Sequence, residues 1–278
     1  METKAKVLAL TQEKIDHAAD LERLKAFRPL DDTFMRCLFR NNIPLAEMVL
    51  RIIIGKQDLA VISCETQADL KRVTGARSIC LDAYATDSQH KKYDIEMQRA
   101  DTGADPHRAR YHASSLDVEN LDAGQKFVML PDTYIILITE NDYFEKGKPV
   151  YWIQRVNQTT GETFDDGSHI LYVNGEYQDD TSDIGKLMHD FRCNNAGDMY
   201  FPLLANRTRY FKETQKGVEE MCKIMEETRE EGIARGIAQG RLETTVKYYR
   251  KGAISAEEAA KDLGMTVEEF RKKAAEIA

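Results

Sequence analysis

Residues 78–99 read Ser-Ile-Cys-Leu-Asp-Ala-Tyr-Ala-Thr-Asp-Ser-Gln-His-Lys-Lys-Tyr-Asp-Ile-Glu-Met-Gln-Arg. Two apolar-rich runs flank a polar turn, a pattern that predicts a β-hairpin. Asp94 and Glu96 share one face of the second strand, because side chains alternate along a strand. If the hairpin centres on Gln89, Asp82 lies opposite Glu96 on that face, and a slip of two residues pairs Asp82 with Asp94 instead. Both registers gather carboxylates on one face of the sheet.

Carboxylates at this separation repel each other, and one of them tends to take up a proton. A bound divalent cation removes that repulsion, and oxygen ligands favour Mg²⁺ or Mn²⁺ over zinc. The alternative is that these acids only solvate the exposed face of a hairpin. The spacing alone favours this simpler interpretation, because short motifs often match by chance.

The composition limits the classes of protein and of partner. A length of 278 residues fits one large or two modest domains, and a hydrophobic content of 42% is enough for a packed core. The net charge of −8 is the reverse of what non-specific DNA binding requires, because such proteins neutralise phosphates with basic residues. Any contact with DNA therefore has to come from local basic clusters.

The cysteines and the apolar runs indicate a compartment. The five cysteines are scattered, with no CxxC pair and no His/Cys cluster, which favours reduced thiols over disulfides or a zinc site. The N-terminus lacks a signal-peptide core, and no apolar run reaches the roughly 18 residues that span a bilayer. We therefore expect a cytoplasmic protein with no membrane partner.

The remaining patterns alternate between helix and strand. Helices are expected around Phe34, over residues 46–54 and over residues 107–121. Strands are expected over residues 59–66, 134–139, 149–158 and 169–173. Further helices are expected over residues 184–191 and 199–210, the second interrupted by Pro202. This order predicts an α/β or α+β architecture with a mixed sheet.

The C-terminal part begins with a long helical pattern, residues 218–251, in which glycine recurs at every fourth position from 232 to 240. Each glycine costs a helix about 0.8–1 kcal/mol relative to alanine. Such a helix either packs closely on a partner backbone or forms only marginally. The capping boxes Ser255–Glu258 and Thr266–Glu269 then predict two short helices, similar to a helix-turn-helix. Acidic residues nearly balance basic ones there, which favours a hairpin that packs or self-associates over one that reads DNA.

Taken together, the motifs resemble a known family. Asp82 followed by Tyr93–Gln98 is similar to the active-site signature of the PD-(D/E)XK nuclease superfamily, and most similar to its transposase-like, recombination-promoting nuclease branch. Similar flanking segments are Pro29–Met35, Arg108–Tyr111, Tyr134–Thr139, Tyr172–Gly175, Met188–Phe191 and Tyr210–Glu213. The resemblance implies a restriction-endonuclease-like α/β fold, in which helices flank a mixed central sheet.

On this resemblance the chain divides into four segments. Residues 1–25 form a polar arm or helix, and residues 26–215 form the nuclease-like domain. A helical extension follows, in which residues 216–251 form the glycine-interrupted helix and residues 252–278 form the small helical hairpin.

The resemblance also implies metal-dependent hydrolysis of phosphodiester bonds. It assigns Asp82 and Glu96 as ligands of Mg²⁺ or Mn²⁺, with help from the backbone carbonyl of Met97. Asp31 or Asp32 stands near the position of an additional acid that some members carry on a helix. The residues alone do not decide between these two.

Gln98 occupies the catalytic position that lysine usually holds in this superfamily. A neutral amide can orient water but supplies no charge, so the metal must lower the pKa of the attacking water further. The resemblance places Arg108, Arg110 and Tyr111 on the next helix, where they contact DNA phosphates, because guanidinium groups bind phosphate in a bidentate manner.

The resulting hypothesis is a Mg²⁺- or Mn²⁺-dependent DNA endonuclease that acts in recombination or transposition. The alternative is a catalytically weak or inactive nuclease fold that serves as a DNA-binding or protein-interaction module. The acidic net charge and Gln98 favour this alternative. A third hypothesis is a homo-oligomer assembled through the C-terminal helices.

Overall fold

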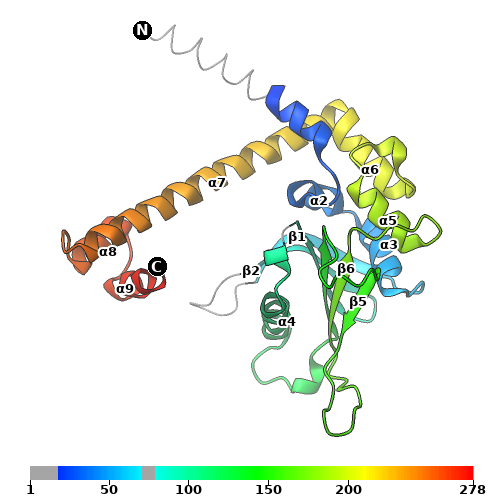
Figure 1. Ribbon diagram of the computed structural model, residues 1–278, viewed down its shortest axis with the longest axis horizontal. Helices are drawn as coiled ribbons and strands as arrows, with labels where there is room; N and C mark the ends of the chain where they lie inside the picture. The colour runs from blue at the N-terminus through cyan, green and yellow to red at the C-terminus, as the bar shows by residue number, and fades with distance from the viewer. Residues whose placement is uncertain (1–17, 71–78, 100, 278) are drawn as a thin grey trace. The chain divides into compact units, whose positions relative to one another are not determined.

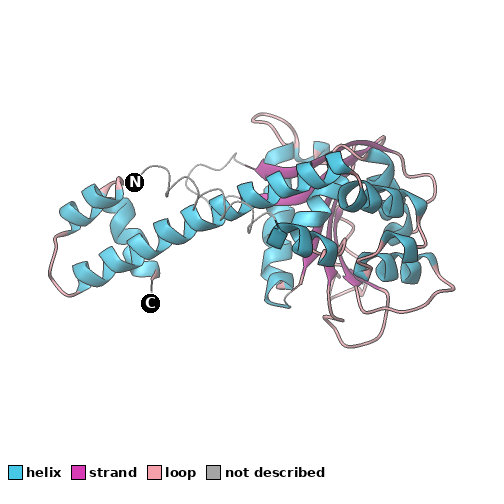
Figure 2. Ribbon diagram, turned by 90° about the horizontal axis from the view of Figure 1, so that it is seen from above, coloured by secondary structure: helices cyan, strands magenta, loops and turns pink. Residues whose placement is uncertain are grey.

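The computed structural model describes residues 18–70, 79–99 and 101–277, so most of the expected N-terminal arm lies outside it. The strands, magenta in Figure 2, form one six-stranded sheet in the order β1-β2-β3-β4-β6-β5. Their bounds are β1 Val61–Leu70, β2 Ile79–Asp87, β3 Lys92–Gln98, β4 Thr133–Thr139, β5 Val150–Ile153 and β6 Ser168–Asn174. Strands β1 to β3 are antiparallel, β3, β4 and β6 are parallel, and β5 is antiparallel to β6. The expected mixed sheet is confirmed.

Helices cover both faces of this sheet (Figure 1). The helices of the two units have the bounds α2 Asp32–Phe39, α3 Ile43–Ile54, α4 Pro106–Asn120, α5 Asp183–Arg192, α6 Pro202–Glu213, α7 Gln215–Arg250, α8 Ala256–Leu263 and α9 Val267–Glu276, and those of the first unit flank the sheet. Helix α4 lies on one side, and its residues Ala109, Ala113 and Leu116 pack on Ile135 and Leu137 of β4. Helices α2 and α3 contact the strands from the other side, and α5 and α6 pack on them. Within the described ranges, no helix is long and apolar enough to span a bilayer.

The β2–β3 turn is organised by one buried carboxylate. Asp87 Oδ1 accepts hydrogen bonds from the amides of Gln89 and Lys91, both at 2.9 Å, and Asp87 Oδ2 accepts one from the Tyr93 hydroxyl at 2.7 Å. His90 has a φ of 63°, in the left-handed region that tight turns use. A turn fixed in this way leaves one register for the two strands that follow from it.

Two helices have a proline in their first turn and begin at residues other than the predicted ones. Helix α3 starts earlier than expected, because the Asn42 side chain accepts a hydrogen bond from the Leu45 amide at 3.3 Å and Pro44 occupies the first turn. Proline is tolerated there, since the first amides of a helix have no intrahelical partner. For the same reason Pro202 begins α6, and the prediction that it interrupts a helix over residues 199–210 was wrong.

The chain divides into two compact units between Cys222 and Lys223, inside α7. The first unit holds the sheet. In the second unit both predicted capping boxes are formed, at Ser255 before α8 and at Thr266 before α9, and Phe270 is fully buried among alanines of these helices. The segment boundaries predicted from the sequence stay predictions.

Two glycines of α7 provide a matched test of packing. A Cβ at Gly217 would lie 2.0 Å from the Tyr210 carbonyl oxygen, whereas a Cβ at Gly240 would meet no described atom within 4 Å. Gly217→Ala should therefore lower the free energy of unfolding by about 1–3 kcal/mol, the usual cost of overpacking. Gly240→Ala should raise it by about 0.8–1 kcal/mol through helix propensity. Urea unfolding of both variants checks this, and an equal effect of the two substitutions would contradict the close approach at Gly217.

Candidate active site

The register of the hairpin brings the first two predicted acids together. Strands β2 and β3 pair Ala83 with Ile95, so the hairpin centres on Gln89 as predicted. This pairing ends at Ala83 and Ile95, and Asp82 and Glu96 are the next residues of the two strands. Both side chains are buried, with exposures of 7% and 1%.

Two hydrogen bonds join Asp82 to the Glu96–Met97 segment of β3. The Asp82 amide donates to Glu96 Oε1 at 3.1 Å, and the Met97 amide donates to Asp82 Oδ2 at 3.3 Å. The Met97 peptide therefore lies beside Asp82, as a role for its carbonyl as a ligand requires. That role itself stays a prediction.

Near Asp82, the side chains of β2 stop alternating between the two faces of the sheet. Leu81 belongs to the core under α4, and Tyr84 packs against the same core although it is three residues further on. A regular strand would put these two side chains on opposite faces. Gln67, at the facing point of β1, has a φ of 57° and marks the same irregularity. Asp82 is consequently within reach of α2, whose Arg36 contacts it.

Asp94 and His112 complete the acid cluster. Asp94 is fully buried, and its Oδ2 lies 2.8 Å from His112 Nδ1 on α4. Its Oδ1 has no hydrogen-bond partner among the described residues. The sequence analysis placed Asp94 on the same face of the strand as Glu96 but did not identify His112. A signal was present, because His112 follows Arg108 by one helical turn and both then face the same strand.

Two arginines neutralise the cluster from opposite sides of the sheet. Arg36 Nη2 on α2 lies 3.2 Å from Asp82 Oδ1 and 2.7 Å from Asp32 Oδ2. Arg108 Nη2 on α4 donates to Glu96 Oε2 at 2.9 Å. The sequence analysis missed Arg36, which is 46 positions from its partner in the chain.

The two candidate helical acids have different surroundings. Asp31 pairs with Arg28 and Arg99, and both arginines also pair with Glu140. Asp32 is joined to Asp82 through Arg36. Of the two, Asp32 is therefore the one linked to Asp82, and the role of an additional acid stays a prediction.

The predicted phosphate-binding residues are not equivalent either. Arg108 is anchored on Glu96, and its side chain is 42% exposed. Arg110 is exposed and lies two residues further on, which is about 200° round the helix. Tyr111 is also exposed. Of these three residues, Arg108 is the one with an established contact to the acid cluster.

The Gln98 side chain is buried and hydrogen-bonded to the acid cluster. It is 8% exposed, and its Nε2 donates to Glu96 Oε2 at 3.4 Å. Its Oε1 lies against Gly103, where an added Cβ would come within 1.9 Å of that oxygen. A side chain at position 103 would therefore push the Gln98 amide out of this place.

Burial dominates the ionisation of the three acids. It raises the pKa of Asp94 to about 8, and the charge of Asp82 adds to this shift. Burial also raises the pKa of Asp82 and of Glu96, with further increases from the charges of Glu96 and Asp94 respectively. A buried oxygen of Asp94 that has no partner among the described residues, beside two further carboxylates, fits a divalent cation, because a cation would supply that oxygen with a partner and offset the carboxylate charge.

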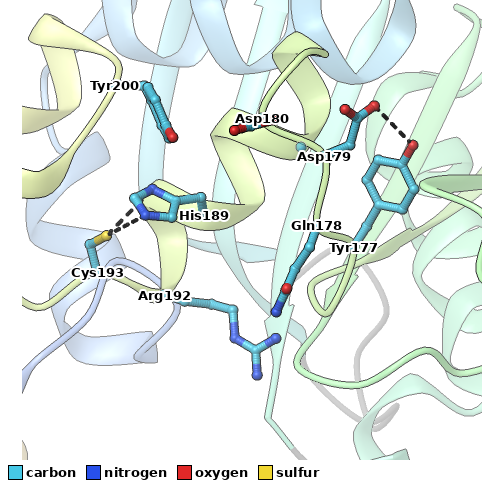
Figure 3. Close-up of a pocket in the computed structure, with 9 residues that line it drawn as sticks. Tyr177, Gln178, Asp179, Asp180, His189, Arg192, Cys193 and Tyr200 are labelled. Carbon is cyan, nitrogen blue, oxygen red and sulfur yellow. Dashed lines mark hydrogen bonds between the residues drawn. The ribbon is translucent and has the colours of Figure 1, made fainter.

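A second cluster lies elsewhere on the first unit. His189 and Cys193 of the α5 end line a cavity of about 590 Å³ (Figure 3), with the Cys193 Sγ 3.6 Å from His189 Nδ1. The sequence analysis expected no His/Cys cluster, and this was wrong. Asp190 beside them is fully buried and accepts the Tyr200 and Phe201 amides, both at 2.8 Å. Its oxygens thus hold the segment that leads into α6, which is a structural role.

Comparison with known proteins gives one match. A family model described as PD-(D/E)XK nuclease family transposase matches residues 41–232, more than two thirds of the 278 residues. Searches of curated proteins and of solved structures found no match.

The buried acids predict a dependence of stability on pH in the absence of metal. Unfolded carboxyls ionise near pH 4, whereas the folded protein holds the Asp94 proton up to about pH 8. The folded state therefore binds more protons in this range, and its free energy of unfolding falls as the pH rises. Asp94→Asn should reduce that fall by more than about 1.4 kcal/mol, the equivalent of one pKa unit. Urea unfolding in EDTA at pH 5 and pH 8 measures the difference. An equal fall in the free energy of unfolding for the variant and the wild type would contradict the prediction.

Proposed function

Because the chain belongs to the PD-(D/E)XK nuclease family transposases, we propose that it is a metal-dependent DNA endonuclease that acts in recombination or transposition. The observation that carries the proposal is the burial of Asp82, Asp94 and Glu96 on two neighbouring strands, with one oxygen of Asp94 left without a hydrogen-bond partner among the described residues. A protein that needed these residues only for stability would gain nothing from three buried acids, since buried charge is costly.

In this proposal Asp82 and Glu96 hold Mg²⁺ or Mn²⁺, with the Met97 carbonyl as a further oxygen and Asp32 as the additional acid. The cation, when bound, lowers the pKa of a water molecule and offsets charge on the phosphate. Gln98 fixes the Glu96 carboxylate through its amide. It thus orients a ligand and leaves the supply of positive charge to other groups.

The arginines are the other source of charge. Arg36 and Arg108 have side-chain exposures of 27% and 42%, so each guanidinium borders both the acids and solvent. Arg108 is the first candidate for a DNA phosphate, because guanidinium groups match phosphate geometry. Arg110 and Tyr111 then extend the DNA contact along the exposed side of α4.

Two further observations support the proposed compartment and oligomeric state. All five cysteines are free thiols, which supports a cytoplasmic protein. Exposed Ile233 and Ile237 on α7 support a homo-oligomer formed through the C-terminal helices.

The second candidate function is a nuclease fold without effective catalysis, used as a DNA-binding or protein-interaction module. Two observations favour it: Gln98 replaces the usual lysine, and the arginines already neutralise Asp82 and Glu96. The two functions differ in their response to metal. A module shows neither DNA cleavage nor a metal-dependent rise in melting temperature.

Glu96→Gln tests the proposal most simply. The variant keeps the shape of the side chain but loses its charge, so cleavage of supercoiled plasmid in Mg²⁺ or Mn²⁺ should fall by more than about 100-fold. Glu65→Gln, at an exposed glutamate of β1, is the matched control and should cleave like the wild type. Equal cleavage by all three proteins would contradict the assignment.

Gly103→Ala tests the role given to Gln98. The new methyl group would displace the Gln98 amide from its place beside Glu96. The rate of cleavage should therefore fall to the level of Gln98→Ala, and combining the two substitutions should add little, because both remove the same contact. Additive losses in the double variant would show that Gly103 acts in another way.

A further inference from the structure

Asp94, Glu96 and His112 present one donor atom each to a common point. Asp94 Oδ2 lies 2.8 Å from His112 Nδ1, and Glu96 Oε1 lies 3.9 Å from the same nitrogen. All three donor atoms lie within 4.8 Å of one another, and the side chains are 0%, 1% and 5% exposed. They come from two elements, β3 and α4, that the core under α4 holds in place.

These separations match an octahedral metal position. With metal–ligand distances of about 2.1 Å, neighbouring ligand atoms lie about 3 Å apart and opposite ones about 4 Å apart. The two separations that involve His112, 2.8 and 3.9 Å, are close to these values, and all three ligand atoms lie within 4.8 Å of one another. A cation at this point would also lie beside Asp94 Oδ1, the carboxylate oxygen that has no partner among the described residues.

The position is less obstructed than the one between Asp82 and Glu96. One oxygen of Asp82 accepts a hydrogen bond from Arg36, and the other accepts one from the Met97 amide. Arg108 donates to Glu96 Oε2, whereas Glu96 Oε1 contacts no arginine among the described residues: it accepts the Asp82 amide at 3.1 Å and lies 3.9 Å from His112 Nδ1. A cation bound by His112 therefore displaces no arginine.

We infer that Asp94, Glu96 and His112 form a metal position within this site, and that the imidazole nitrogen makes it select a first-row transition-metal dication such as Mn²⁺ over Mg²⁺. Imidazole suits transition metals, whereas Mg²⁺ takes oxygen ligands and dehydrates reluctantly. Binding replaces the hydrogen bond between His112 Nδ1 and Asp94 Oδ2, since the metal takes the place of the hydrogen between them. The use of this metal in catalysis rests on the proposed function, but its binding does not.

The test is pulsed electron paramagnetic resonance on the full-length protein loaded with one equivalent of Mn²⁺. A directly bound imidazole gives a ¹⁴N modulation of the electron spin echo. We expect this modulation in the wild type and in His107→Gln, a control at the 78% exposed histidine of the same helix. It should be absent in His112→Gln, in which the excess of Mn²⁺ over Mg²⁺ affinity should fall by about 10–100-fold.

The wild-type spectrum decides the inference even if His112→Gln fails to fold. Bound Mn²⁺ without ¹⁴N modulation, or modulation that persists in His112→Gln, would overturn it. These results differ from failure of the proposed function. A protein that shows the modulation but cuts no DNA keeps the metal position and loses the nuclease assignment, whereas one that cuts DNA without the modulation does the reverse.

Discussion

Three carboxylates buried side by side are the constraint on which the rest of the first unit depends. Asp82, Asp94 and Glu96 sit on two hydrogen-bonded strands, where desolvation and mutual repulsion both oppose their charged forms. The fold offsets this cost with guanidinium groups from both sides, Arg36 on α2 and Arg108 on α4. The placement of these two helices against the sheet is thus coupled to the charge of the site.

The charge of these two arginines bears on position 98, where glutamine replaces the usual lysine. An amide at the usual lysine position supplies no charge, but it holds Glu96 Oε2 together with Arg108. Positive charge near the acids comes instead from helices that flank the sheet. On the proposed function, a cation competes with Arg36 for Asp82, and a displaced guanidinium is available to a DNA phosphate.

The sequence predicted the part of the site that depends on local pattern. Strand alternation and a turn around Gln89 were sufficient to predict the register that brings Asp82 close to Glu96, because hairpin register follows from turn geometry. The mixed sheet followed from the order of helices and strands, and from a family resemblance that the matched family model supports.

What the sequence did not predict depends on long-range packing. Nothing local shows that the alternation of β2 breaks beside Gln67, or that Arg36 reaches across from α2 to Asp82. His112 faces the acids only because alanines and a leucine on α4 fix the rotation of that helix on the sheet. The choice between two adjacent aspartates at the start of α2 likewise required the positions of their arginine partners.

The central claim is that the buried acids exist to hold a divalent cation. The most direct measurement is anomalous X-ray diffraction at the manganese edge from crystals of the full-length protein equilibrated with Mn²⁺. The account predicts an anomalous peak bonded to the Glu96 carboxylate. Full occupancy elsewhere, for example at His189 and Cys193, with no peak at Glu96 would contradict it.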